Sequence, residues 1–171
     1  MGKSLKENVC EERLFGKIYK DYATHLYNFL YYKFGDQLQP QDKVQEAFIK
    51  LWKKCKEVPP SKAKSFLFTV ANNLMLNEFK HQKIVLKYQE VHTSKINNQD
   101  PQFLIEEKEY LIKFQHALSK LTESQRVAFM MNRTEGKKHK EIADILGVST
   151  KAVEKRIYSA LKKLREDLKE I

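Results

Sequence analysis

The stretch KHKEIADILGVSTKAVEKRIYSALKKL, residues 138–164, decides the fold of the C-terminal half of this 171-residue chain. Its pattern predicts two helices joined by a sharp turn. Gly147 falls at the turn, where glycine adopts a positive φ without steric cost, and Ser149 follows as an N-cap for the second helix. The inner faces of both helices are predicted from apolar residues at helical spacing: Ile142, Ala143, Leu146, Ala152, Val153, Ile157 and Leu161. We therefore predict a helix-turn-helix.

The outward side of the second helix is predicted to read DNA. Polar and charged residues remain there for contacts with base edges in the major groove: Lys151, Glu154, Lys155, Tyr158 and Ser159. Glutamate accepts from cytosine N4 and lysine donates to guanine, so the set suits that task chemically. Further candidates for DNA contact lie in and next to the two helices, several of them phosphate-binding cations: Lys138, Lys140, Ser149 and Arg156. A helical hairpin with a solvated charged face is the alternative that the pattern leaves open.

The composition favours a polyanionic partner. The net charge is +10, from 32 Lys+Arg against 22 Asp+Glu, and both halves of the chain are basic. Such an excess attracts nucleic acid, although a lysine-rich solvated surface has the same composition. Glycine and proline are scarce, with 5 and 4 residues, and no alternating β-branched run indicates a strand. The fold class is therefore predicted to be all-α, with two small helical domains.

The two cysteines, Cys10 and Cys55, lie far apart in the sequence and have no metal-binding companions. We expect two reduced thiols, as is usual in a cytoplasmic protein, and no metal site. The N-terminus has no apolar run of signal-peptide length, and no segment is long and apolar enough to span a bilayer. The sequence thus predicts a cytoplasmic protein without a cofactor.

Two amphipathic helices are predicted in the first part of the chain. The first begins near Glu11 and ends at the break around Gly35. Asp42 is placed to cap the second helix, with Gln45 completing a capping box. The buried stripe of this second helix is predicted to contain Val44, Ala47, Phe48, Leu51, Trp52 and Cys55.

A third helix is predicted to begin near Ser61 or Ser65, after a double proline that disfavours helix before it. A continuation of one or two turns past His81 stays open. The three helices predict an N-terminal bundle of three or four helices, because each carries an apolar face that needs a partner. Helical periodicity then fades, and the turn residues that follow predict a flexible linker.

Four helices are predicted in the second part of the chain, beginning near Pro101. Thr122 to Gln125 reads as a capping box at the start of the second of them. The last two are the helix-turn-helix. We therefore expect a first domain at 1–82, a linker at 83–102 and a second domain at 103–171.

Three segments together resemble one family, the extracytoplasmic-function (group IV) sigma factors of bacterial RNA polymerase. DKVQEAFIKLW at 42–52 is similar to the family's D-x-V-Q-E-x-F-x-x-L-W segment, which docks on the clamp helices of the polymerase. FLFTVANNLMLNEFK at 66–80 is similar to the segment that recognises and opens the −10 element. Residues 117–164 resemble the −35-reading domain, whose A-L-x-x-L-x-x-x-x-R opening ends here at Arg126.

This resemblance implies a transcription-initiation subunit with a sigma region 2-like first domain and a region 4-like second domain. It implies that core polymerase is held by Asp42, Gln45, Glu46 and Lys50. It implies that the unpaired −10 strand, including one flipped base, is held by Ser61, Lys62, Lys64, Asn72, Asn73, Asn77 and Lys80. The residues named above for the helix-turn-helix are then expected to contact the −35 element.

The −10 segment departs from the family pattern. The family commonly has A-R-N-x-x-x-D where this chain has Ala71-Asn72-Asn73 and Asn77. Amides thus replace an arginine and an acid, which leaves the exact −10 preference open. Amides read base edges and cations hold phosphates, so both kinds of contact remain in the segment. A buried structural role for Asn73 is the alternative.

The partners that the resemblance implies are core RNA polymerase, promoter DNA and a separate anti-sigma factor. A DNA-cleaving enzyme is disfavoured, because the five histidines are scattered and no paired acidic motif accompanies the helix-turn-helix. An autonomous regulator that binds an operator as a dimer remains the alternative function. The chain shows neither a ligand pocket nor a phosphoacceptor domain that would favour it.

Overall fold

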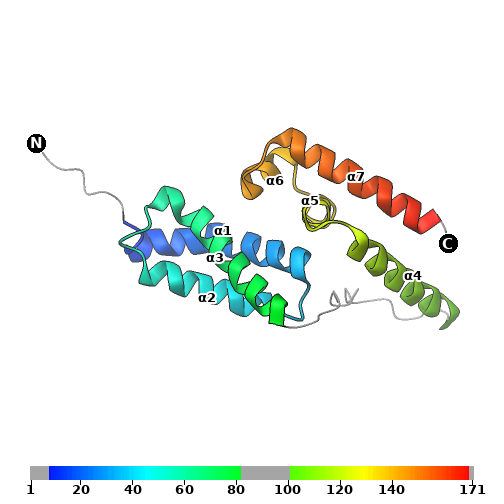
Figure 1. Ribbon diagram of the computed structural model, residues 1–171, viewed down its shortest axis with the longest axis horizontal. Helices are drawn as coiled ribbons and strands as arrows, with labels where there is room; N and C mark the ends of the chain where they lie inside the picture. Colours follow the sequence, from blue (N-terminus) through cyan, green and yellow to red (C-terminus); the bar gives the residue numbers. More distant parts are fainter. Residues whose placement is uncertain (1–7, 82–100, 170–171) are drawn as a thin grey trace, which may run out of the picture. The chain divides into compact units, whose positions relative to one another are not determined.

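The computed structural model describes residues 8–81 and 101–169, and every regular element within them is a helix (Figure 1). The chain forms two compact units, one with the helices before residue 82 and one with those after residue 100. Each unit has an apolar core of its own. The predicted all-α class is therefore confirmed.

The first unit is a bundle of α1 (Glu12–Phe34), α2 (Pro40–Lys53) and α3 (Pro60–His81). Each of these helices contacts the other two, and Figure 1 shows α2 running beside α1 while α3 crosses both at an angle. All three supply fully buried side chains, among them Leu26, Leu30, Leu51, Leu67 and Met75. This shared core holds α2 and α3 side by side, and so positions the surface that lies between them.

The start of α2 differs from the sequence prediction. The helix begins at Pro40, after Gln39 in the left-handed conformation with φ 49°, and no side chain caps it. Proline suits the first helical position, because its φ is already helical and its missing N–H has no partner there. Asp42 lies within the first turn, where a carboxylate interacts favourably with the helix dipole. The predicted capping box of Asp42 and Gln45 is therefore wrong.

Trp52 lies at the edge of the predicted buried stripe of α2 and not inside it. Its side chain is 45% exposed, although its ring makes an edge contact with Phe15 of α1 at a centroid distance of 5.0 Å. Residues seven positions apart share a helix face, so Trp52 lines up with the exposed Gln45. The other predicted members of the stripe are buried or half-buried.

Cys10 and Cys55 are joined by a disulfide, with their Cα atoms 4.9 Å apart. The prediction of two reduced thiols is therefore wrong. The segment before α1 runs back to the end of α2, and Val9 in that segment is fully buried in the first unit's core. Helix packing sets this proximity, and a separation of 45 residues along the chain contains no indication of it.

The second unit contains α4 (Pro101–Lys120), α5 (Glu123–Arg133), α6 (His139–Leu146) and α7 (Thr150–Lys169). α7 contacts each of the other three. The predicted capping box at the start of α5 is confirmed: Gln125 N–H donates to Thr122 Oγ1 at 3.3 Å, and Thr122 N–H donates to Gln125 Oε1 at 3.1 Å. One apolar cluster joins α4, α5 and α7 through Ala117, Leu118, Leu121, Phe129, Ala160 and Leu164.

The turn between α6 and α7 has the predicted chemistry. Gly147 ends α6 with φ 66°, a conformation that glycine adopts without the cost a Cβ would add. Ser149 Oγ accepts from Ala152 N–H at 3.2 Å and thereby caps α7. Ile142 and Val153 are fully buried where the two helices meet. The helix-turn-helix is therefore confirmed.

Arg126 of α5 is a charged side chain inside the second unit, with only 2% of its surface exposed. Its Nη1 donates to the carbonyls of Leu121 at 3.1 Å and Leu118 at 3.4 Å. These carbonyls lie at the end of α4, where the Leu118 carbonyl also accepts from Leu121 N–H at 3.2 Å. Arg126 thus fastens α5 to the end of α4.

Two sequence predictions lie outside the described residues: the continuation of α3 past His81 and most of the linker at 83–102. Within the described ranges, no helix is long and apolar enough to cross a membrane. The same ranges contain no group of three or more His, Cys, Asp and Glu residues that could hold a metal ion.

Candidate nucleic-acid and protein interfaces

The exposed side of α7 carries most of the residues that were predicted to read a DNA groove. Lys151, Glu154, Lys155 and Tyr158 are all exposed, and Tyr158 presents 74% of its surface. They recur at three- and four-residue spacing, which places them along one side of the helix. This side therefore offers cations, one carboxylate and one aromatic ring to a partner.

Ser159 and Glu154 have partners that the sequence prediction did not include. Ser159 is half-buried, and its Oγ accepts from Gln125 Nε2 of α5 at 2.8 Å, so its expected outward position is wrong. Glu154 remains exposed, but its Oε1 lies 3.7 Å from Nδ1 of His139 at the start of α6.

The candidate phosphate contacts lie at the start of α6, at the cap of α7 and, for Arg156, in the second turn of α7. Lys138 and Lys140 are exposed at the start of α6, while Arg156 of α7 is half-buried. Ser149 is exposed, and its hydroxyl oxygen is occupied as the cap of α7. The structure thus brings these residues to the same helix-turn-helix, with Lys138 and Lys140 the most accessible cations among them.

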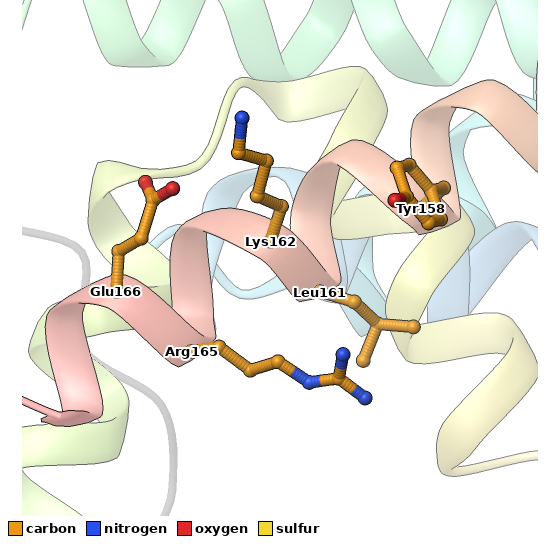
Figure 2. Close-up of a pocket in the computed structure, with 5 residues that line it drawn as sticks. All are labelled: Tyr158, Leu161, Lys162, Arg165 and Glu166. Atoms are coloured by element: carbon orange, nitrogen blue, oxygen red, sulfur yellow. The ribbon is translucent and has the colours of Figure 1, made fainter.

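A hollow of about 290 Å³ extends the surface of α7 beyond Tyr158. Its lining comes from successive turns of the helix: Tyr158, Leu161, Lys162, Arg165 and Glu166. Figure 2 shows the Lys162 and Glu166 side chains on one side of α7 and those of Leu161 and Arg165 on the other. This lining contains no nucleophile paired with a base, so the hollow continues a basic surface and does not suit catalysis.

The asparagines of α3 have different surroundings. Asn72 is half-buried, and its Oδ1 accepts from Lys33 Nζ of α1 at 2.8 Å. Asn73 and Asn77 are exposed and lie one helical turn apart. The buried structural role that was the alternative for Asn73 therefore fits Asn72 instead, and the Asn73 side chain is exposed to solvent.

A groove of about 420 Å³ lies between the last turn of α2 and the middle of α3. It is lined by Lys50, Lys53, Lys54, Phe66, Val70, Asn73, Leu74 and Asn77. Both exposed asparagines thus share one groove with three lysines and three apolar side chains.

A second hollow, of about 450 Å³, adjoins the first, because Phe66 and Val70 line both. The rest of its lining lies at the α2–α3 connection and in the first turns of α3: Glu57, Val58, Pro59, Lys62, Ser65 and Thr69. We call the two hollows together the α2–α3 groove.

Three lysines at the end of α2 line the groove, a position that the sequence did not predict for them. Lys50 was expected on a polymerase-docking face, but it lines the groove while pairing with Glu46 at 3.1 Å. Lys53 and Lys54 are exposed and line the same groove, and the sequence prediction missed them. A lysine-rich helix end was visible in the sequence, but only the packing of α3 against α2 gives these lysines amide neighbours.

The remaining residues predicted to contact the −10 element also belong to α3, which forms one side of the groove. Lys62 lines the second hollow. Ser61 and Lys80 are exposed at the two ends of α3, outside the lining of the groove, and Lys64 is half-buried. The structure therefore gathers Lys62, Asn73 and Asn77 and leaves the others outside.

The outer face of α2, formed by Asp42, Gln45, Glu46, Ile49 and Trp52, combines polar and apolar groups. Asp42 and Gln45 are exposed, as predicted. Ile49 and Trp52 are 53% and 45% exposed, so two large apolar side chains lie beside these polar ones. The sequence prediction did not count either as a surface residue. The sequence indicated their exposure only weakly, because Trp52 also fits the apolar spacing of the buried stripe.

Comparisons with known proteins match both units. The Sigma-70 region 2 family matches residues 18–84, and the Sigma-70 region 4 family matches residues 111–164. The ECF RNA polymerase sigma factor SigL of Mycobacterium tuberculosis is 24% identical over 165 residues, which cover 95% of this chain and 93% of SigL. SigM of Bacillus subtilis, another ECF RNA polymerase sigma factor, is 27% identical over 152 residues, or 87% of this chain and 91% of SigM. A chain in a solved RsbN–BldN complex covers 91% of this chain at 18% identity and a TM-score of 0.35.

A helical region 2 followed by a helix-turn-helix region 4 defines a sigma factor of the sigma-70 type. The chain belongs to the extracytoplasmic-function (ECF) RNA polymerase sigma factors, as the resemblance of its three segments predicted. It functions as such a factor in transcription initiation and is not an enzyme.

Proposed function

We propose that this sigma factor uses three separate surfaces in initiation. The outer face of α2 docks on core RNA polymerase, the α2–α3 groove holds the unpaired −10 strand, and the exposed side of α7 reads the −35 duplex. The first two surfaces belong to a domain at 1–82 and the third to a domain at 103–171, joined by a linker at 83–102. The observation that carries this proposal is the groove, because it joins cations, amides and apolar walls.

The groove matches the chemistry of an unpaired strand. Lys53 and Lys54 are exposed cations for phosphates, and Asn73 and Asn77 are exposed amides for base edges. Phe66 lines both hollows and offers part of an aromatic ring to a base, a contact worth about 1–3 kcal/mol in single-strand binding. A site that holds the unpaired strand and not the duplex shifts the equilibrium toward opening, so melting needs no catalysis by the chain.

A base flipped out of the −10 element fits the second hollow, at the α2–α3 connection. Extruding a base costs a few kcal/mol, which contacts in a pocket must offset. Lys62 supplies a cation there, and Val58, Phe66 and Val70 supply apolar surface. We assign the flipped base to this hollow and the following nucleotides to the hollow that contains Asn73.

The outer face of α2 has the composition of a protein-docking surface. Interfaces place aromatic and aliphatic side chains at their centre and polar groups around them. Ile49 and Trp52 supply the apolar part, and Asp42, Gln45 and Glu46 the polar part. Lys50 shares an ion pair with Glu46 and so connects this face to the groove.

The exposed side of α7 is proposed to enter the −35 major groove. Glu154 is assigned to a cytosine, and Lys151 and Lys155 to guanines or nearby phosphates. Lys138 and Lys140 of α6 are assigned to the phosphate backbone, which fixes the register of α7 in the groove. Two weak DNA sites on one chain gain effective concentration when polymerase holds both elements at the right spacing.

A separate anti-sigma protein is proposed as the regulator, and the cytoplasm as the place of action. A protein that covers Ile49 and Trp52 would block polymerase docking without touching the DNA surfaces. The support is the exposure of these two apolar side chains, because burying apolar surface against a partner lowers the free energy of the complex. The cytoplasm is where polymerase and promoter DNA meet this factor.

The docking proposal is tested by the association of labelled sigma factor with core polymerase. Gln45→Ala/Glu46→Ala is expected to weaken association by roughly tenfold, about 1.4 kcal/mol, through lost polar contacts. A matched control is Asp21→Ala/Thr24→Ala, which removes one acid and one polar residue from the exposed surface of α1. Association that stays equal to wild type in the α2 variant, with the helical circular dichroism retained, means that the docking face lies elsewhere.

The second test separates a sigma factor from an autonomous regulator. The purified chain alone is expected to bind promoter duplex weakly, and to bind a −10/−35 promoter tightly only with core polymerase. Tight binding by the isolated chain as a dimer favours the regulator, and would mean that α7 acts without the surfaces assigned to α2 and α3.

A further inference from the structure

Cys10 and Cys55 connect two parts of the first unit that lie far apart along the chain. Cys10 lies two residues before the start of α1, and Cys55 lies two residues after the end of α2. They are the only two cysteines of the sequence, and they form a disulfide. The bond therefore ties the beginning of α1 to the end of α2.

This tie adjoins the outer face of α2. Trp52 of that face lies three residues before Cys55 and contacts Phe15, in the first turns of α1, at a centroid distance of 5.0 Å. Phe15 in turn contacts Phe48 at 6.1 Å. Val9, next to Cys10, is fully buried in the same core. The position of Trp52 thus depends on how the start of α1 packs against α2, which is the contact that the disulfide fixes.

Both cysteines are half-buried, so neither is sealed inside the core of the first unit. In a reducing compartment, a protein disulfide is ordinarily a transient or redox-sensing bond and not a permanent one.

We propose that Cys10 and Cys55 form a reversible thiol–disulfide site that regulates polymerase docking, with a small disulfide such as glutathione disulfide as the oxidant. The inference rests on the proposed function in two respects, namely that Trp52 belongs to the docking face and that the protein acts in the reducing cytoplasm. The chemical step at the two cysteines does not depend on it.

The exchange proceeds in two attacks. One cysteine thiolate attacks a sulfur of glutathione disulfide, forming a mixed disulfide and releasing one glutathione thiolate. The second cysteine thiolate attacks the protein sulfur of that mixed disulfide, closing the Cys10–Cys55 bond and releasing the second glutathione. The two cysteines lose two electrons and two protons, and two glutathione thiols carry them. Excess reduced glutathione reverses both steps.

The closed bond keeps the start of α1 against the turn that carries Trp52. Opening it allows the segment around Val9 to leave the core, and Trp52 then loses the fixed packing of Phe15. Affinity falls in proportion to the fraction of molecules that keep the binding-competent arrangement, so we expect polymerase binding at least about threefold weaker without the bond. The midpoint of thermal unfolding is expected to fall by about 10 °C, because the bond closes a long loop.

The test equilibrates the full-length chain in glutathione buffers of increasing oxidised fraction. Mass spectrometry follows the loss of two hydrogens, and core-polymerase affinity is measured on the same samples. Closure over a range of buffers, together with a gain of at least about threefold in affinity for the closed form, supports the proposal. Thiols that stay free in excess glutathione disulfide overturn it, and so does a closed form whose polymerase affinity equals that of the open form.

The double variant Cys10→Ser/Cys55→Ser has no thiol and serves as a permanently open form. It is compared with oxidised wild type in one buffer free of reductant, so that the polymerase experiences identical conditions in both measurements. The variant is expected to bind like the reduced wild type, with an affinity that does not change with the glutathione buffer. Failure of the docking proposal looks different: neither redox form then depends on Gln45 and Glu46 for polymerase binding, while closure of the bond is still seen by mass.

Discussion

The helix-turn-helix of the second unit and the α2–α3 groove of the first differ in how the chain builds them. The helix-turn-helix uses one continuous stretch, in which Gly147 makes the turn and Ser149 caps the next helix. The groove takes its lysines from the end of α2 and its amides from α3, and only the packing of the bundle joins them. A surface on one helix can therefore be predicted from the periodicity of the sequence, whereas a surface between two helices can be identified only from their packing.

Arg126→Met tests the second unit without touching the first. The substitution leaves the carbonyls of Leu118 and Leu121 without their buried donor, so we expect the unfolding free energy of this unit to fall by about 3 kcal/mol. The chain's single tryptophan, Trp52, reports on the first unit alone. In urea, the circular dichroism transition should gain an earlier phase while the Trp52 fluorescence transition stays in place.

The exposed Arg133 at the end of α5 is the matched control. Arg133→Met is expected to change stability by less than about 0.5 kcal/mol, because the side chain is solvated. Equal effects of the two substitutions contradict the role given to Arg126.

Lys53→Ala/Lys54→Ala tests the groove without touching the helix-turn-helix. Each lysine is assigned one phosphate of the unpaired strand, so the salt slope of −10 strand binding should fall by about 1.4. Affinity of the polymerase–sigma complex for a forked promoter should fall by roughly tenfold, about 1.4 kcal/mol. Binding to a −35 duplex placed on the same complex should not change.

Lys17→Ala/Lys20→Ala removes the same charge from the exposed surface of α1 and controls for net charge. If this variant loses as much forked-promoter affinity as the α2 variant, the attraction is diffuse and the groove has no special part in it.

Ser149→Ala tests the local construction of the helix-turn-helix and has the smallest expected effect. Loss of the cap to Ala152 N–H should lower the unfolding free energy of the second unit by about 1 kcal/mol. Thr150→Ala, one residue later and exposed, is expected to have a smaller effect. The two variants are compared by urea unfolding, and a larger loss from Thr150→Ala contradicts the assignment of the cap.

Much of the fold was predictable because it follows from local rules. The glycine turn, the cap at Ser149 and the capping box of Thr122 with Gln125 each depend on a few neighbouring residues, and each is confirmed. Asp42 was assigned as a cap because its type suits that position, but Pro40 suits the start of α2 better. Local rules fail where two local signals compete.

The other features that sequence reasoning missed depend on packing between segments. Cys10 meets Cys55 because the chain before α1 returns to α2, and Ser159 turns toward Gln125 because α5 packs on α7. Trp52 satisfied the apolar pattern and still lies at the surface. Lys53 and Lys54 are candidates for DNA contact because α3 packs beside them and places Asn73 and Asn77 in the same groove. Periodicity identifies the face of a helix but not the neighbour that covers it.

The unpaired −10 strand is proposed to lie in the α2–α3 groove, and site-specific crosslinking can locate it there. A photoreactive amino acid at position 70, whose valine lines both hollows, is compared with one at position 155 on α7, each in complex with core polymerase and a forked promoter. We expect position 70 to crosslink to the unpaired −10 strand and position 155 to the −35 duplex. Crosslinking of position 70 to polymerase or to duplex alone, with none to the unpaired strand, contradicts it.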